Sequence, residues 1–155
     1  MNRARVWLMT AGLLIAGARA YGQDSSRLAG CLGHPLTAYG KAFEDMTTET
    51  KRTPHGTLTV GDYKTGSARI EVVQKAGAKA PDLVNVFYYQ QPQRDWKLAL
   101  KDIGVSSVGA AAKEDAKHQV HLRGIKAGRL TRITAVYIPL DKDHPDGPEL
   151  HIHLQ

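Results

Sequence analysis

Residues 81–104 constrain the fold of this chain more than any other stretch. They read as a strand over residues 83–89 that passes through a break at Pro92 into a short amphipathic helix carrying Trp96. The strand is apolar at successive positions, and such strands are typically covered on both faces. The sequence therefore predicts a central strand followed by a helix that covers one of its faces.

Alternation of apolar and polar side chains predicts five further strands. They are expected over residues 57–63, 68–73, 119–125, 130–138 and 149–154. Short turn-forming stretches separate them, and turns of hairpin length join antiparallel neighbours. The expected sheet is therefore antiparallel.

Two helices are expected beside these strands. The first begins near Pro35, which suits the first helical position, and it places four apolar side chains on one face: Leu36, Tyr39, Phe43 and Met46. The second covers residues 93–103, and Gly104 is its stop signal. Each helix needs an apolar sheet face against which to pack.

The expected order is helix, three strands, helix, three strands, in sub-units over about residues 35–90 and 93–155. We therefore expect a single α+β domain over residues 34–155, with antiparallel sheet and helices packed on one face; tandem α-βββ units are one arrangement of this kind. This order resembles the layout of beta-lactamase-inhibitor-like tandem domains and of their single-unit relatives among bacterial envelope lipoproteins. The resemblance concerns element order alone and gives no residue a role.

Residues 1–20 have the parts of a secretory signal peptide. Arg3 and Arg5 form a positive start, residues 7–17 form an apolar run too short to span a bilayer, and the segment ends in Ala-Arg-Ala. We expect cleavage after Ala20, export to the periplasm or the medium, and a flexible lead over residues 21–33.

The charge of the chain argues against a nucleic-acid partner. Three arginines of the signal peptide supply half of the formal net charge of +6. The remaining basic residues are scattered, whereas a nucleic-acid surface normally gathers them into a stripe.

Cys31 is the only cysteine, so the chain has no internal disulfide. Residues 28–30 read Leu-Ala-Gly, and with Cys31 they match a bacterial lipobox, in which the cysteine is lipidated and tethers the protein to a membrane. A polar, charged spacer separates this motif from the apolar run and favours a free thiol. Pairing with a second chain is the third alternative. A membrane contact is expected only if Cys31 is lipidated.

The strand over residues 149–154 carries the best candidate metal ligands. Alternation places Glu149, His151 and His153 on one face. Imidazole and carboxylate groups suit zinc or copper, and His118 or His121 would complete a site if its strand lies alongside. The alternative, favoured because His-x-His is a weak signal, is a polar sheet face open to water without a cofactor.

Aromatic side chains offer a second kind of candidate site. Four of them lie within residues 81–104: Phe87, Tyr88, Tyr89 and Trp96. Aromatic anchors dominate many binding surfaces, and one helix covers only one face of the strand. Some of these rings are therefore candidates for contact with a protein or cell-envelope partner, while the alternative places them all in the core.

The sequence carries little support for catalysis. No serine lies in a Gly-x-Ser-x-Gly motif, and no glycine-rich phosphate loop is present. We therefore expect a small exported, non-enzymatic binding domain that acts through an open sheet face, apolar and aromatic and without a convergent polar cluster. A metal-binding periplasmic protein is the alternative. A hydrolase, the third hypothesis, would require a pocket lined by polar groups distant in sequence.

Overall fold

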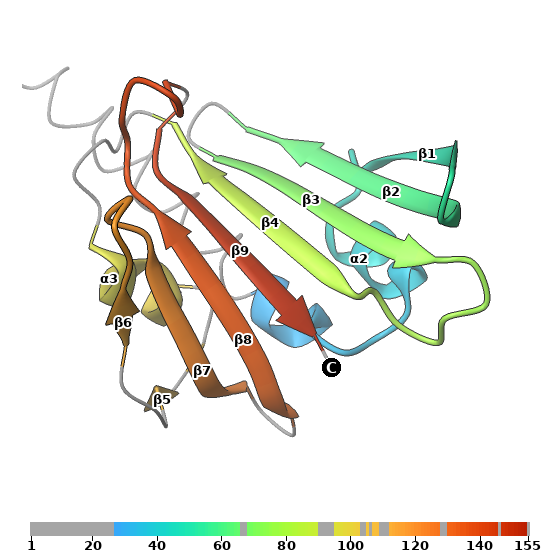
Figure 1. Ribbon diagram of the computed structural model, residues 1–155. Coiled ribbons are helices and arrows are strands. Elements are labelled where there is room, and N and C mark those ends of the chain that lie inside the picture. Colours follow the sequence, from blue (N-terminus) through green and yellow to red (C-terminus); the bar gives the residue numbers. More distant parts are fainter. Residues whose placement is uncertain are drawn as a thin grey trace, which may run out of the picture.

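Backbone pairing joins the strands into one nine-stranded antiparallel sheet in the order β1-β2-β3-β4-β9-β8-β7-β5, with β6 also paired to β7 (Figure 1). This is a computed structural model, and it describes residues 27–65, 68–89, 95–102, 105, 107–108, 112–127, 130–145 and 147–154. The predicted signal peptide lies outside the described residues. The prediction of an antiparallel, sheet-dominated fold is confirmed.

The first half of the sheet is a meander of four consecutive antiparallel strands. They are β1 (Thr47–Thr53), β2 (Gly56–Lys64), β3 (Ala68–Lys75) and β4 (Leu83–Tyr88). The sequence pattern predicts no strand at β1, because this Thr-rich and charged segment has almost no buried side chain. The first sub-unit therefore has four strands where the sequence predicts three.

The second half closes back onto the first. It contains β5 (Ser107–Val108), β6 (Lys113–Glu114), β7 (Val120–Ala127), β8 (Leu130–Ile138) and β9 (Glu149–Leu154). The chain crosses from β4 to the far edge and returns through β7 and β8, so that β9 lies between β8 and β4. The two predicted sub-units consequently share one continuous sheet.

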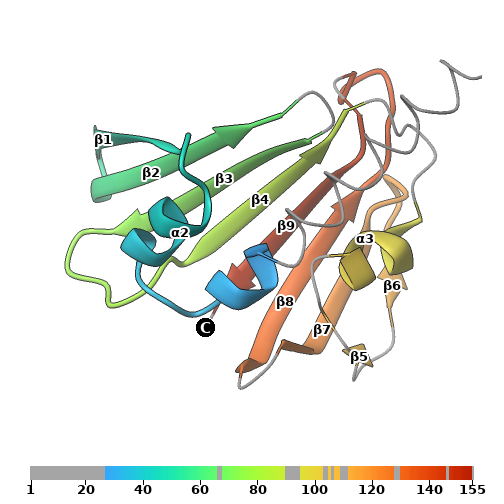
Figure 2. The same ribbon diagram turned by 180° about the vertical axis from the view of Figure 1, so that it is seen from behind.

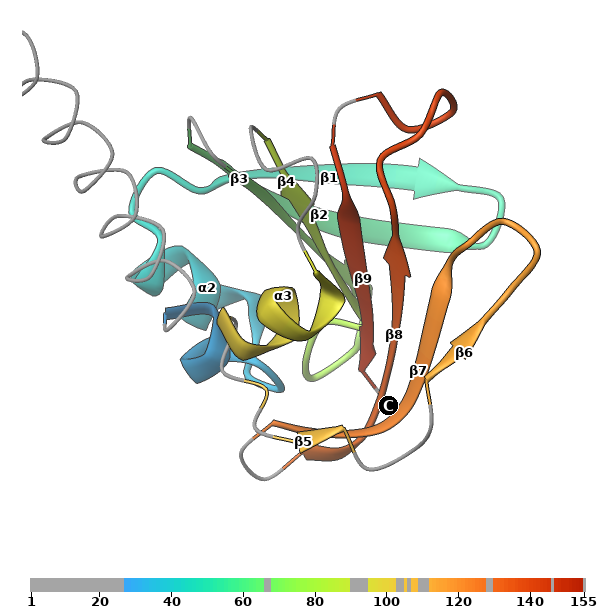
Figure 3. The same ribbon diagram turned by 90° about the vertical axis from the view of Figure 1, so that its left-hand side faces the viewer.

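Two short helices, α2 (Leu36–Ala42) and α3 (Trp96–Asp102), lie on the same side of the sheet (Figures 2 and 3). Tyr39 and Phe43 pack from α2 and its C-terminal end, and Ala99 and Leu100 pack from α3, into one core cluster with the sheet. The hydroxyl of Tyr88 in β4 donates to the Ala99 carbonyl at 3.4 Å, which ties the central strand to α3. We call this side of the sheet the covered face.

Residues 27–31 form a further helical turn on the covered face. The sequence predicts a flexible lead over residues 21–33, but Leu28, Cys31 and Leu32 are buried in the core cluster. These three apolar side chains lie on one side of the turn, and their burial fixes this part of the chain. Residues 21–26 lie outside the described part of the chain.

None of the described helices is long and apolar enough to cross a membrane.

Candidate functional site

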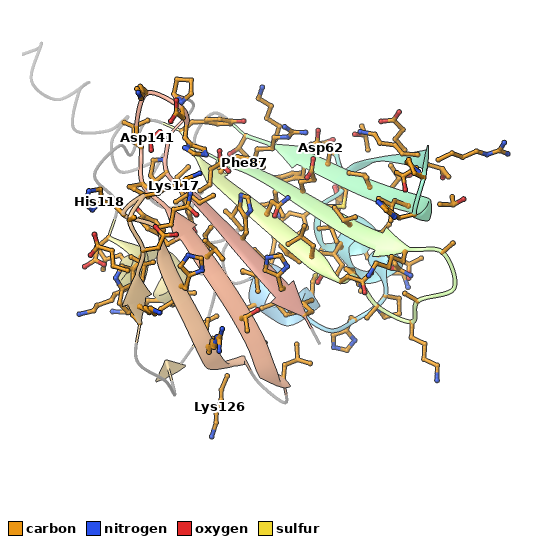
Figure 4. The ribbon with its side chains drawn as sticks, viewed as in Figure 1. Asp62, Phe87, Lys117, His118, Lys126 and Asp141 are labelled. Atoms are coloured by element: carbon orange, nitrogen blue, oxygen red, sulfur yellow. The ribbon has the colours of Figure 1, made fainter. Side chains whose placement is uncertain are left out.

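The side of the sheet opposite the helices carries most of the candidate functional side chains. We call it the uncovered face, and Figure 4 looks onto it. Cross-strand pairing aligns one row of side chains across six strands, because directly paired residues share a face. In strand order the row reads Asp62, Glu71, Asn85, His151, Val136 and His121.

A hydrogen-bonded network centred on Arg69 fixes one half of this row. Its guanidinium donates from Nε and Nη2 to the two carboxylate oxygens of Asp62 at 2.8 and 3.0 Å, and Nη2 also lies 3.4 Å from Glu71 Oε2. These contacts, led by the hydrogen bond to Asp62, raise the pKa of Arg69 above its ordinary value. Bidentate pairing of this kind holds arginine in a defined orientation.

Asn85 extends this network into the middle of the sheet. Its Nδ2 donates to Glu71 Oε1 at 2.9 Å, while its Oδ1 is buried and has no hydrogen-bond partner among the described residues. Asn85 is only 7% exposed although no helix covers it, since neighbouring side chains of the uncovered face surround it. A buried hydrogen-bond acceptor without a donor lowers the stability of the folded protein and is uncommon in native structures.

Apolar and aromatic side chains lie on either side of the polar row. Val60, Val73 and Leu83 are directly paired across β2, β3 and β4, and all three are half-buried. On the opposite side the Phe87 ring packs under Arg69, whose Cζ is 5.5 Å from the ring centroid, and edge-on to His151 at 6.3 Å. We define the central patch as these six residues together with Asn85, and it is mixed, with a polar centre.

The four aromatic residues predicted as a binding surface do not lie together. Phe87 is on the uncovered face, whereas Tyr88 points into the core and is fully buried. Tyr89 is half-buried beyond the end of β4, beneath the ammonium group of Lys64. Trp96 packs from α3 against the core cluster. Only Phe87 therefore contributes to the central patch.

The expectation of a face without convergent polar groups is wrong. Asp62, Arg69, Glu71 and Asn85 converge from three strands. Nothing in the sequence indicated this, because only the strand register shows which charges face one another.

The predicted metal ligands share the uncovered face of β9, as the alternation indicates. Glu149 Oε2 and His151 Nε2 are 2.7 Å apart, so these two groups bind each other. Partial burial, followed by the charge of His151, lowers the pKa of His153. Within the described residues, no group of three or more His, Cys, Asp or Glu side chains is placed to hold a metal ion. His121 lies two strands away from His151 in the same row, separated by Val136.

Cys31 is a buried thiol whose Sγ lies 3.7 Å from the Ala38 carbonyl oxygen. Burial raises its pKa, which disfavours the reactive thiolate. Lipidation would need the thiol exposed and the chain cut before it, and that cut would remove Leu28, which is fully buried in the core.

A hollow of about 860 Å³ lies near the other end of the uncovered face, between β6, β7 and β8. Polar side chains from different parts of the chain line it, among them Lys113, Asp115, His121, Arg123 and Thr134. The polar pocket that the hydrolase hypothesis requires is therefore present, although no serine or cysteine is among the described residues that line it. We call it the β6–β8 hollow.

No protein-family model, no curated protein and no solved structure compared with this chain matches it.

Proposed function

We propose that this protein is a small exported, non-enzymatic binding domain whose partner, a protein of the cell envelope, docks on the central patch of the uncovered face. The observation that carries the proposal is the composition of that patch. Half-buried apolar side chains and the Phe87 ring surround polar groups that are already fixed by hydrogen bonds. The described helices pack on the opposite face and leave this surface free for a partner.

Preorganisation is the physical reason to favour recognition here. Arg69 is held by Asp62 and Glu71 before any partner arrives, so little side-chain entropy remains to be lost on docking. Protein interfaces combine apolar and polar surface, as this patch does, with aromatic residues and arginine enriched. The unpartnered Oδ1 of Asn85 adds an acceptor that a small shift of a neighbouring side chain would open to a donor.

Site-specific photo-crosslinking tests the proposal in the producing cell. A photoreactive residue at Phe87 or Val73 is expected to give a discrete adduct with an envelope protein. The matched control is Leu98, which is 54% exposed on α3. Equal adducts from Leu98, or none from Phe87 and Val73, would contradict the proposal.

Export belongs to the same proposal, because the partner lies in the cell envelope. The expected mature form begins at residue 21 with a free Cys31. Intact-mass measurement of the exported protein tests this, and rapid alkylation of the native protein would contradict a buried thiol. An N-terminal lipidated Cys31 would replace this proposal by membrane attachment.

Zinc or copper binding by Glu149, His151 and His153 is a second candidate function. The arrangement of the three on one face of β9 favours it, and the lowered pKa of His153 supplies a neutral imidazole. The metal would have to replace the Glu149–His151 hydrogen bond. Zinc and copper titrations of the wild type and of the His151→Ala/His153→Ala variant decide it, since equal sub-stoichiometric binding in both would remove the metal site.

A further inference from the structure

The β6–β8 hollow is framed by a hairpin whose turn is held by one carboxylate. Asp115 Oδ1 accepts from the backbone N–H groups of Lys117 and Gln119 at 2.8 and 3.1 Å. Its Oδ2 lies 2.8 Å from His121 Nε2, and this hydrogen bond is the main reason that the pKa of Asp115 is lowered. Asp115 is therefore ionised near neutral pH, and groups of the protein already satisfy both of its oxygens.

Two cations of the same hollow have no such partner. Lys113 is directly paired with His121 across the hairpin, and Arg123 follows His121 by two positions on the same strand. Both side chains are exposed, and among the described residues neither forms an ion pair. Among the described residues that line the hollow there are thus two cations and a single carboxylate, and that carboxylate is held by His121.

The backbone beneath Arg123 is irregular, which shapes the hollow. The pairing of β7 with β8 shifts register between Leu122 and Ile125, and Gly124 adopts φ +64° within this bulge. Bulges bend the strand and redirect its side chains. Thr134 and Val136 of β8 line the hollow beside this bend and add one hydroxyl and one apolar surface.

We propose that the β6–β8 hollow binds a small organic anion, whose carboxylate or phosphate group pairs with Lys113 and Arg123. Arginine and lysine are the residues that recognise these groups, and arginine does so through two parallel hydrogen bonds. The volume of the hollow lies in the range of small-molecule sites. Val136 contacts the apolar body of the ligand, and Thr134 and His121 supply hydrogen bonds. This site is independent of the proposed partner surface, because it lies over β6, β7 and β8.

Four probes test the proposal by amide NMR titration of the full mature chain: benzoate, phenyl phosphate, inorganic phosphate and the uncharged benzamide. Benzoate and phenyl phosphate are expected to bind with a Kd of about 1 mM or tighter, with shifts concentrated at residues 112–123 and 134–136. Benzamide is expected to give no saturating shift there. A preference for benzoate or for phenyl phosphate identifies which anionic group the hollow accepts.

Charge-matched variants separate the site from general electrostatics. Lys113→Gln/Arg123→Gln is expected to raise the Kd at least about tenfold for whichever of benzoate and phenyl phosphate binds more tightly, because two charged hydrogen-bond donors are lost. Lys51→Gln/Arg52→Gln removes the same two charges from β1, at the opposite edge of the sheet, and is expected to leave the Kd unchanged. All four side chains are exposed, so both variants are expected to keep the wild-type fold.

Several results would overturn the proposal. They are an equal loss of affinity in the two variants, benzamide binding as tight as benzoate, inorganic phosphate binding as tight as phenyl phosphate, and an absence of shifts at the hollow with every probe. These four results concern only the binding of small ligands. They can therefore be told apart from a failure of the photo-crosslinking test at Phe87.

Discussion

Arg69 and Arg123 stand on the same face of one sheet, in its two halves, and their surroundings differ. Arg69 is enclosed by Asp62, Glu71 and the Phe87 ring. Arg123 lines a hollow in which the single carboxylate is bound to His121. In the first half of the uncovered face the cation is thus paired with two carboxylates, whereas the hollow in the second half keeps a positive excess. This difference underlies our two proposals, a protein partner on the first half and an anionic ligand on the second.

The largest expected effect on stability comes from disturbing the place where the two halves of the sheet join. There β4 pairs with β9, and we call this pairing the β4–β9 seam. Gly147 precedes β9 with φ +116°, and a Cβ there would overlap the Tyr88 carbonyl oxygen. Gly147→Ala is expected to cost about 3 kcal/mol or more of unfolding free energy, because both strain and overlap act. Urea denaturation measures it. Gly77→Ala, with φ +79° and open space around it, is the control and is expected to cost about 1 kcal/mol.

Replacing Arg69 is expected to lower the unfolding free energy more than replacing Arg123, and both losses are expected to be smaller than that of Gly147→Ala. Arg69→Gln leaves Asp62 and Glu71, which are directly paired, without their shared cation. These groups are partly exposed, so we expect a loss of about 1–2 kcal/mol. Arg123→Gln is expected to change stability by less than about 0.5 kcal/mol. Equal losses in urea denaturation would show that the halves do not differ in this way.

A substitution at Asn85 tests how much the polar network of the first half contributes to stability. Asn85→Leu removes a buried acceptor that has no partner, at the cost of one hydrogen bond to Glu71. We expect a change within about 1 kcal/mol in either direction, because the two effects oppose each other. Val86→Asn is the control: it buries an amide on the covered face and is expected to cost at least about 2 kcal/mol. A loss at Asn85 as large as at Val86 would contradict this account.

The smallest effect concerns pH and His153, which lies beside the seam. Its pKa in the folded protein is lowered, mainly by partial burial, so the folded state favours the neutral ring. Stability is therefore expected to fall as the pH drops through the ordinary histidine pKa of about 6.5 and to level off below the lowered value. His153→Gln should reduce the change in unfolding free energy between pH 7 and pH 5. If urea denaturation shows the same change in the variant, His153 is not its origin.

The sequence predicts the six strands that have buried side chains and misses β1, which has none, and the two-residue strands β5 and β6. β9 alternates as expected, with Leu150 and Ile152 in the core. Because β1 is exposed along most of its length, it has no apolar period to recognise, and it forms by pairing with β2. The first helix is placed correctly but ends at Ala42, before Phe43 and Met46. Residues 93–94 and 103 of the second predicted helix lie outside the described part of the chain.

The candidate sites depend on information that the sequence does not contain. Asp62 and Arg69 meet only through the register of β2 against β3, and one residue of slippage would send them to opposite faces. The β6–β8 hollow depends on a bulge and on which strand lies beside β7. Alternation placed Glu149, His151 and His153 on one face, but the short distance between Glu149 and His151 appears only in three dimensions.

The position of β9 between β4 and β8 has a consequence for folding. Until β9 arrives, β4 and β8 are both open edges with unpaired backbone groups, and their pairing with β9 joins segments as distant as Asn85 and His151. Such non-local pairing is slow to form, and open edges invite other chains. The β9 strand of a second copy can pair in the same position between β4 and β8. Partly folded chains at high protein concentration would therefore form dimers that exchange β9. Dilution during refolding should therefore raise the yield of monomer.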